Sequence, residues 1–127
     1  MCIRDRPYTP QPAQLYLGAA GTGAPLHFHG DALNVLAHGE KQWWLFPPDA
    51  ANYSVGRASE WVRRELPHLC SLCEARAVPA RRCPLRVTQY AGDLVFVPRD
   101  WAHATLNTRP SIGYAVEFDS PHSRSST

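Results

Sequence analysis

Residues 98–107, with the sequence PRDWAHATLN, decide the fold when they are read together with residues 25–31, PLHFHGD. Both stretches carry candidate metal ligands in sequence that predicts β-strands bounded by Gly and Pro. These ligands are His27, His29, Asp31 and His103. Closely spaced ligands on one strand and a further ligand on a distant strand are typical of a facial metal site that keeps positions open for substrates. The pattern therefore indicates iron oxygenase chemistry.

Length and composition set broad bounds on the protein. A chain of 127 residues is one domain, and its hydrophobic content of 44% with four Trp is enough for a core. No run of about 18 apolar residues could span a membrane. The formal charge of +2 predicts neither a nucleic acid nor a membrane as a partner. The first residues lack the apolar stretch of a signal peptide, so we expect a soluble protein whose compartment stays open.

Gly, Pro and Asp divide the chain into short extended segments. We expect these at residues 15–17, 24–29, 32–37, 42–46, 85–90, 93–97, 102–106 and 112–118. One short helix is expected after a cap at Ser59, ending at Pro67, and residues 67–84 are expected to be an irregular loop. Many short strands and one excursion helix predict an all-β, antiparallel jelly roll. The aromatic residues expected in its core or pocket wall are Trp43, Trp44, Phe46, Phe96 and Trp101.

The chain ends fit no element of this jelly roll. We expect residues 1–14 to be a non-native or truncated start, residues 15–119 to form the domain, and the Ser-rich residues 120–127 to be a disordered tail.

A family resemblance becomes specific in the second half of the chain. Gly92, Pro98, His103 and Asn107 follow the second sequence motif of the cupin superfamily, although Asp100 stands where that motif has Gly. Together with residues 25–29, Asn34 and residues 39–48 (GEKQWWLFPP), this motif makes the chain resemble JmjC-domain, cupin-like oxygenases. The resemblance is closest to the small JmjC-only hydroxylases and implies a double-stranded β-helix. Family members are longer at the N-terminus, so the chain is expected to be the C-terminal part of such a domain.

The resemblance also implies how a metal would be held. Family members bind Fe(II) through a His-x-Asp/Glu pair and a distal His, which fall on His27 and His103. His29 occupies the carboxylate position. Three imidazoles could hold Fe(II), or Asp31 could serve instead, because residues 27, 29 and 31 share a face of an extended strand. We favour His27, His29 and His103, since His29 stands at the family position.

The cosubstrate implied by the resemblance is 2-oxoglutarate. Its far carboxylate would pair with Lys41, the only Lys in the sequence, which precedes a Trp-rich strand where a buried charge needs a partner. A lone Lys in a turn is otherwise more often a solvated residue. Asn34 matches an Asn that contacts the cosubstrate in related hydroxylases, and Asn107 and Thr105 are weaker candidates past the distal His.

The expected function is that of an Fe(II)- and 2-oxoglutarate-dependent oxygenase that hydroxylates a protein or peptide side chain. A non-catalytic JmjC-like interaction module and a three-His cupin dioxygenase acting on a small molecule are the alternatives. Cys70, Cys73 and Cys83 could bind zinc with His68, form a disulfide or stay free. The oligomeric state cannot be inferred from the sequence.

Overall fold

The structure, a computed structural model, describes residues 12–118. The expected disordered tail and most of the expected truncated start lie outside these residues. The strands are β1 (Gln14–Gly18), β2 (Asp31–His38), β3 (Glu40–Phe46), β4 (Leu85–Tyr90), β5 (Leu94–Val97), β6 (Ala102–Asn107) and β7 (Ser111–Phe118). The α-helix is α1 (Ala58–Glu74), and short 3-10 turns lie at Pro48–Ala50 and Ala80–Arg82. None of these helices is long and apolar enough to cross a membrane.

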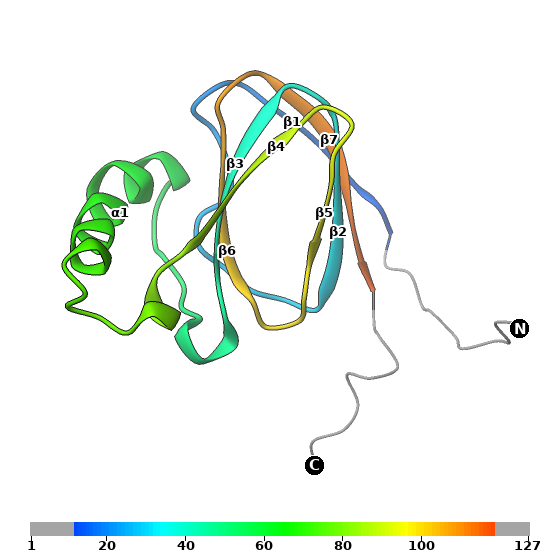
Figure 1. Cartoon of the computed structure of the whole chain (residues 1–127). Helices are drawn as coiled ribbons and strands as arrows, with labels where there is room; N and C mark the ends of the chain where they lie inside the picture. Colours follow the sequence, from blue (N-terminus) through cyan, green and yellow to red (C-terminus); the bar gives the residue numbers. More distant parts are fainter. Residues whose placement is uncertain (1–11, 119–127) are drawn as a thin grey trace, which may run out of the picture.

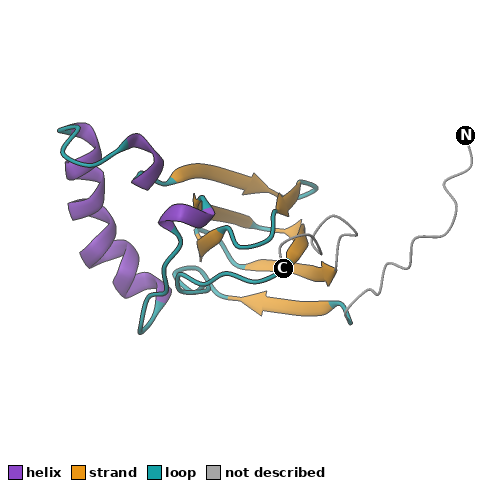
Figure 2. Cartoon of the chain, turned by 90° about the horizontal axis from the view of Figure 1, so that it is seen from below, coloured by secondary structure: helices purple, strands orange, loops and turns teal. Residues whose placement is uncertain are grey.

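The strands form two facing antiparallel sheets. One sheet has the order β1-β7-β2-β5 and the other β4-β3-β6. Figure 1 shows the two sheets enclosing the interior, with α1 on the outer side of the three-stranded sheet, and the view from below in Figure 2 separates the helix from the strand layers. This is the jelly roll that the sequence predicts.

Strand β3 is buried on both faces, and its alternation separates two apolar clusters. Trp44 and Phe46 face α1 and pack against Trp61, with ring centroids 6.0 and 6.3 Å apart. Trp43 and Leu45 point between the sheets and pack with Val97 and other residues. Since successive strand residues point to opposite sides, Lys41 shares the inner face with Trp43, which directs a charged side chain into the interior.

Helix α1 is longer than predicted, because Pro67 lies inside it rather than at its end. Leu69 and Cys70, beyond the proline, pack against the same core cluster as Trp61. Tertiary packing therefore outweighs the hydrogen bond that a proline removes. The predicted cap at Ser59 is also wrong, since Arg57 is the N-cap residue and its side chain caps nothing.

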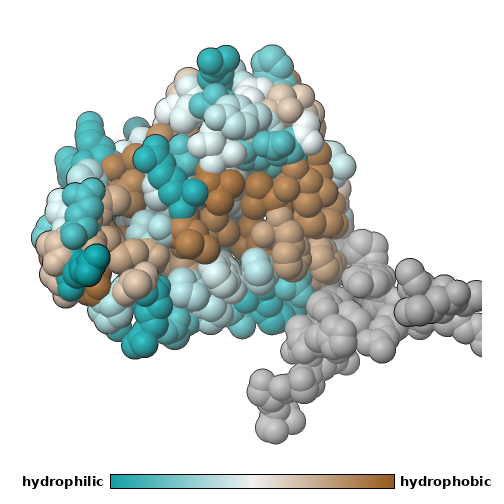
Figure 3. Space-filling view, viewed as in Figure 1, coloured by the Kyte–Doolittle hydropathy of each residue, from teal (hydrophilic) through white to brown (hydrophobic). Residues whose placement is uncertain are grey.

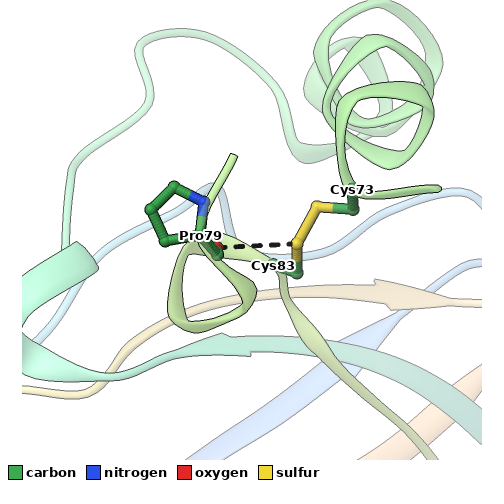
Figure 4. Close-up of a disulfide and its surroundings, with 3 residues drawn as sticks. All are labelled: Cys73, Pro79 and Cys83. Carbon is green, nitrogen blue, oxygen red and sulfur yellow. Dashed lines mark hydrogen bonds between the residues drawn. A yellow bond between two sulfur atoms is a disulfide. The ribbon is translucent and has the colours of Figure 1, made fainter. Parts of the chain in front are cut away.

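A disulfide joins Cys73, in the last turn of α1, to Cys83 before β4 (Figure 4). The predicted loop 67–84 thus begins as helix, up to Glu74, and continues as a short connection that the disulfide closes. Among the described cysteines, Cys70 is free. In residues 12–118 the only cluster suited to a metal consists of histidines, not of these cysteines.

The outer face of the four-stranded sheet is apolar. Leu94 and Phe96 of β5, at the edge of this sheet, are 56% and 49% exposed. Figure 3 shows apolar surface on the side of the molecule where β5 and β4, the edge strand of the other sheet, lie. The prediction of a buried Phe96 is therefore wrong: Val95 and Val97 take the inward positions of β5, and Phe96 points outward.

Candidate metal centre

Three histidines meet at one end of the space between the sheets. His27 and His29 lie on the connection that leads into β2, and His103 lies on β6. The predicted strand 24–29 is reduced to one bridge, in which the backbone N–H groups of His27 and His103 each donate to the other's carbonyl, at 3.1 and 2.8 Å. The backbone thereby fixes two of the three side chains directly beside each other.

In the turn before β6, Asp100 stands where the cupin motif has Gly, and its backbone conformation shows why the turn still forms. Its φ of 64° lies in the left-handed region, which favours Gly but which Asp adopts more readily than most residues. The Asp100 N–H donates to the His29 carbonyl at 2.9 Å. The turn therefore ties the His29 backbone to the strand that carries His103.

The imidazole rings converge. One ligand atom from each of the three side chains lies within 4.8 Å of the other two. Each Nδ1 lies within hydrogen-bond distance of a backbone carbonyl: Pro25 at 2.6 Å for His27, Gly30 at 2.8 Å for His29 and Trp101 at 3.0 Å for His103. A carbonyl only accepts, so we infer that each Nδ1 carries the proton and each Nε2 presents a lone pair.

Burial favours the neutral form of the His27 and His103 imidazoles. It lowers the pKa of His103 to about 4, against a weaker opposing effect of the Trp101 carbonyl, and it lowers the pKa of His27. Because only a neutral imidazole binds a metal, these two side chains are suited to a cation at neutral pH.

Asp31, the alternative third ligand, is engaged elsewhere. Its Oδ1 accepts a hydrogen bond from the Arg99 N–H at 2.8 Å, and it does not belong to the cluster of converging side chains. The geometry therefore favours His29 over Asp31.

A cavity of about 510 Å³ extends from the histidines between the sheets. Lys41 lines it and is 6% exposed. Its Nζ lies 3.6 Å from the centroid of the Tyr16 ring, and no carboxylate of the described residues lies within ion-pair distance of it. Burial lowers the pKa of Lys41 to about 8. An ammonium in this position favours an anionic ligand.

Two neighbours of Lys41 offer further donors. The Asn34 Oδ1 accepts from the Tyr16 hydroxyl at 2.7 Å, which leaves the amide N–H groups of Asn34 available to the cavity. The Thr105 oxygen accepts from the Ala24 N–H at 3.2 Å, so its own proton is available too. Together with Lys41, these donors suit a carboxylate.

Asn107 also lines the cavity, but its orientation differs from that expected of a carboxylate ligand. Its amide N–H donates to the Thr22 hydroxyl at 3.2 Å, and that hydroxyl donates to the Ala19 carbonyl. The buried Oδ1 of Asn107 has no hydrogen-bond partner among the described residues. Since this oxygen only accepts, Asn107 suits a water or an ammonium better than a carboxylate.

Two cavity residues escaped the sequence analysis. Tyr16 supports both Lys41 and Asn34, and Glu117 lines the cavity from β7. The close approach of Tyr16 depends on Gly113, where a Cβ would collide with the Tyr16 hydroxyl. A glycine in an apolar strand was the one sequence signal for this contact.

The chain resembles known proteins over nearly all described residues. The family model described as "JmjC domain, hydroxylase" matches residues 14–118. Human JmjC domain-containing protein 8 is 32% identical over 98 residues, which cover 76% of this chain and 34% of that protein. The human 2-oxoglutarate and iron-dependent oxygenase JMJD4 is 33% identical over 107 residues, which cover 77% of this chain and 24% of that protein. The matched part of the chain thus spans about a third of the length of the first relative and about a quarter of the second.

A solved structure shares the fold. YcfD, a ribosomal oxygenase from Escherichia coli in complex with cobalt and succinic acid, aligns with a TM-score of 0.55 and 14% identity. The alignment covers 88% of this chain and 24% of the YcfD chain. At this identity the match supports the jelly-roll fold alone.

Proposed function

Because the chain belongs to the JmjC domain family, we propose that it is an Fe(II)- and 2-oxoglutarate-dependent oxygenase that hydroxylates a side chain of a protein or peptide. The observation that carries the proposal is that one cavity contains both a three-imidazole cluster and a buried ammonium that has no carboxylate partner among the described residues. The first suits a divalent metal and the second suits the far end of a dicarboxylate.

The donor set fits iron. Neutral imidazoles bind Fe(II), and a three-residue set leaves coordination positions open. His27, His29 and His103 would hold the ion through their Nε2 atoms, oriented by the backbone carbonyls at Nδ1. The bound Fe(II) would supply the activation of O₂ that is coupled to the oxidative decarboxylation of 2-oxoglutarate.

The cavity also fits the length of a short dicarboxylate. In the pairing of β3 with β6, Lys41 lies opposite Asn107 and Leu45 lies opposite His103. These positions are four residues apart, roughly 14 Å along a strand, and the His103 and Lys41 side chains occupy part of that span. Lys41 would pair with the far carboxylate, assisted by Asn34 and Thr105. Trp43 and Val97 form apolar wall that limits access of water.

The comparisons support the same chemistry without extending to the substrate. The relative JMJD4 is named as 2-oxoglutarate and iron-dependent. The YcfD structure contains succinic acid, the diacid that remains when 2-oxoglutarate loses one carbon as CO₂.

The proposal is tested by oxygen uptake and succinate formation with Fe(II), with and without 2-oxoglutarate. We expect both to require 2-oxoglutarate, and both to be lost in His103→Ala and Lys41→Met. Uptake that ignores 2-oxoglutarate would instead favour a three-His dioxygenase. A folded, Fe(II)-loaded protein with no uptake would favour a non-catalytic module. Substrate candidates would then be screened by mass spectrometry for the gain of one oxygen atom.

A further inference from the structure

The cavity holds two oppositely charged side chains at different places. Among the described residues that line it, Lys41 is the only Lys or Arg and Glu117 the only carboxylate. No ion pair joins the two, and no hydrogen bond within the described residues engages the Glu117 side chain. Asp31, the nearest carboxylate in sequence to the histidines, is held by the Arg99 N–H. Within residues 12–118, Glu117 is therefore the one carboxylate available to this cavity.

The register of β7 directs Glu117 inward. Glu117 pairs with Ala32 of β2, and Ala115 pairs with Asn34; all four line the cavity. The alternate residues Ile112 and Tyr114 are exposed on the outer face. Since successive side chains of a strand point to opposite faces, the position of Glu117 in β7 directs its side chain to the interior, whichever rotamer it adopts.

Glu117 lines the same cavity as the three histidines. The neighbouring residue of β7 also lies beside the histidine segment, because a Cβ added at Gly30, which follows His29, would lie 3.9 Å from the Phe118 carbonyl oxygen. The Glu117 carboxylate is not one of the converging ligand atoms within 4.8 Å. Glu117 therefore lines the cavity beside the three imidazoles without being one of the converging ligands.

Charge counting shows what such a carboxylate would do. Three neutral imidazoles leave a divalent metal with its full 2+ charge, and Lys41 adds 1+. The dianion of 2-oxoglutarate lowers that sum to 1+, and Glu117 brings it to zero. Buried charge is costly unless it is balanced.

We propose that Glu117 is the positioning carboxylate of this metal centre. From β7 it would supply the negative charge that is missing from the His-x-His segment because His29 stands at the carboxylate position. This inference rests on the proposed function, because it assumes a metal at the three histidines. Glu117 would balance the metal charge or accept a hydrogen bond from a metal-bound water, without being one of the three ligands.

The test is Mn(II) binding by isothermal titration calorimetry, which needs no turnover. We compare wild type with Glu117→Gln, which removes the charge and keeps the shape, and with Glu117→Asp, which keeps the charge. Glu74→Gln, at an exposed position in α1, is the matched control. We expect Mn(II) affinity to fall about 10-fold in Glu117→Gln, to recover within about threefold in Glu117→Asp, and to be unchanged in Glu74→Gln.

A second measurement separates charge from structural damage. Succinate binding to the metal-free protein should strengthen about threefold in Glu117→Gln, because a negative charge leaves the cavity. Misfolding would weaken both ligands instead. Equal Mn(II) affinity in wild type and Glu117→Gln would overturn the inference and leave the proposed function intact. Absence of Mn(II) binding in folded wild type would overturn both.

Discussion

Replacing Lys41 with Met should stabilise the metal-free protein while removing its affinity for 2-oxoglutarate. Burial lowers the pKa of Lys41 from 10.5 to about 8, and each step of one in pKa corresponds to about 1.4 kcal/mol. Keeping the ammonium charged in this cavity therefore costs about 3 kcal/mol below pH 8. The Tyr16 ring, 3.6 Å from Nζ, offsets about 1 to 2 kcal/mol of that cost.

The net gain expected for Lys41→Met is thus about 1 to 2 kcal/mol at pH 7, or an increase in Tm of about 5 °C. The gain should shrink as the pH rises from about 8 to 10.5, because the folded wild type loses its proton there before the unfolded chain does. Circular dichroism melts at pH 7 and pH 10 measure it.

Binding of 2-oxoglutarate to the Mn(II)-loaded protein should fall by about 100-fold in the same variant, since a buried charge pair is lost. Lys41→Arg keeps the charge and is the control, for which we expect no gain in Tm. A lower Tm in Lys41→Met, or 2-oxoglutarate affinity equal to wild type, would refute the reasoning.

Four further outcomes are expected. The metal-free protein should lose about 3 kcal/mol of stability as the pH falls from 6.5 to 4, because the pKa of His103 is 6.5 in the unfolded chain and about 4 in the folded chain. Urea unfolding at several pH values measures this loss. A stability that does not change with pH, or the same pH dependence in His103→Gln as in wild type, would contradict the prediction. Cys83→Ser should cost about 2 to 3 kcal/mol in urea unfolding, because it opens the loop to Cys73, whereas Cys70→Ser at the free cysteine should change little. Gly113→Ala should cost about 3 kcal/mol and weaken 2-oxoglutarate binding, because its Cβ would collide with both the Tyr16 hydroxyl and the Val35 carbonyl. Unchanged binding in the folded variant would show that Tyr16 does not support Lys41. His29→Asp should raise Mn(II) affinity and 2-oxoglutarate turnover, since it adds the carboxylate typical of facial iron sites; weaker Mn(II) binding would show that His29 is needed as an imidazole.

The sequence predicts the strands of this fold well because their ends are set locally. Gly92, with a φ of 95°, and Pro47 each mark where a strand stops. The sequence also predicted the three histidines and Lys41 as candidate site residues, because each stands in a recognisable segment within a strand or at its border. Even Asp100, where a glycine was expected, adopts the left-handed conformation that the motif requires.

What the sequence did not predict depends on contacts between distant segments. Pro67 reads as a helix end, and only the packing of Leu69 and Cys70 on the core shows that the helix continues. Phe96 reads as a core residue until the register of β5 turns it outward.

The same reason explains why Glu117 and Tyr16 were missed. β7 pairs with both β1 and β2, and each partner lies far from it in sequence. Only this pairing shows that Glu117 and Tyr16 share the cavity with Lys41 and the histidines.

The most direct test of the metal and cosubstrate site is an anaerobic titration of Fe(II) into the protein with 2-oxoglutarate present, followed through the visible metal-to-ligand charge-transfer band. We expect a band in wild type, its loss in His29→Ala, its weakening in Lys41→Met and its persistence in Asp31→Ala. A folded wild-type protein without the band, or a band lost in Asp31→Ala and kept in His29→Ala, would contradict the account.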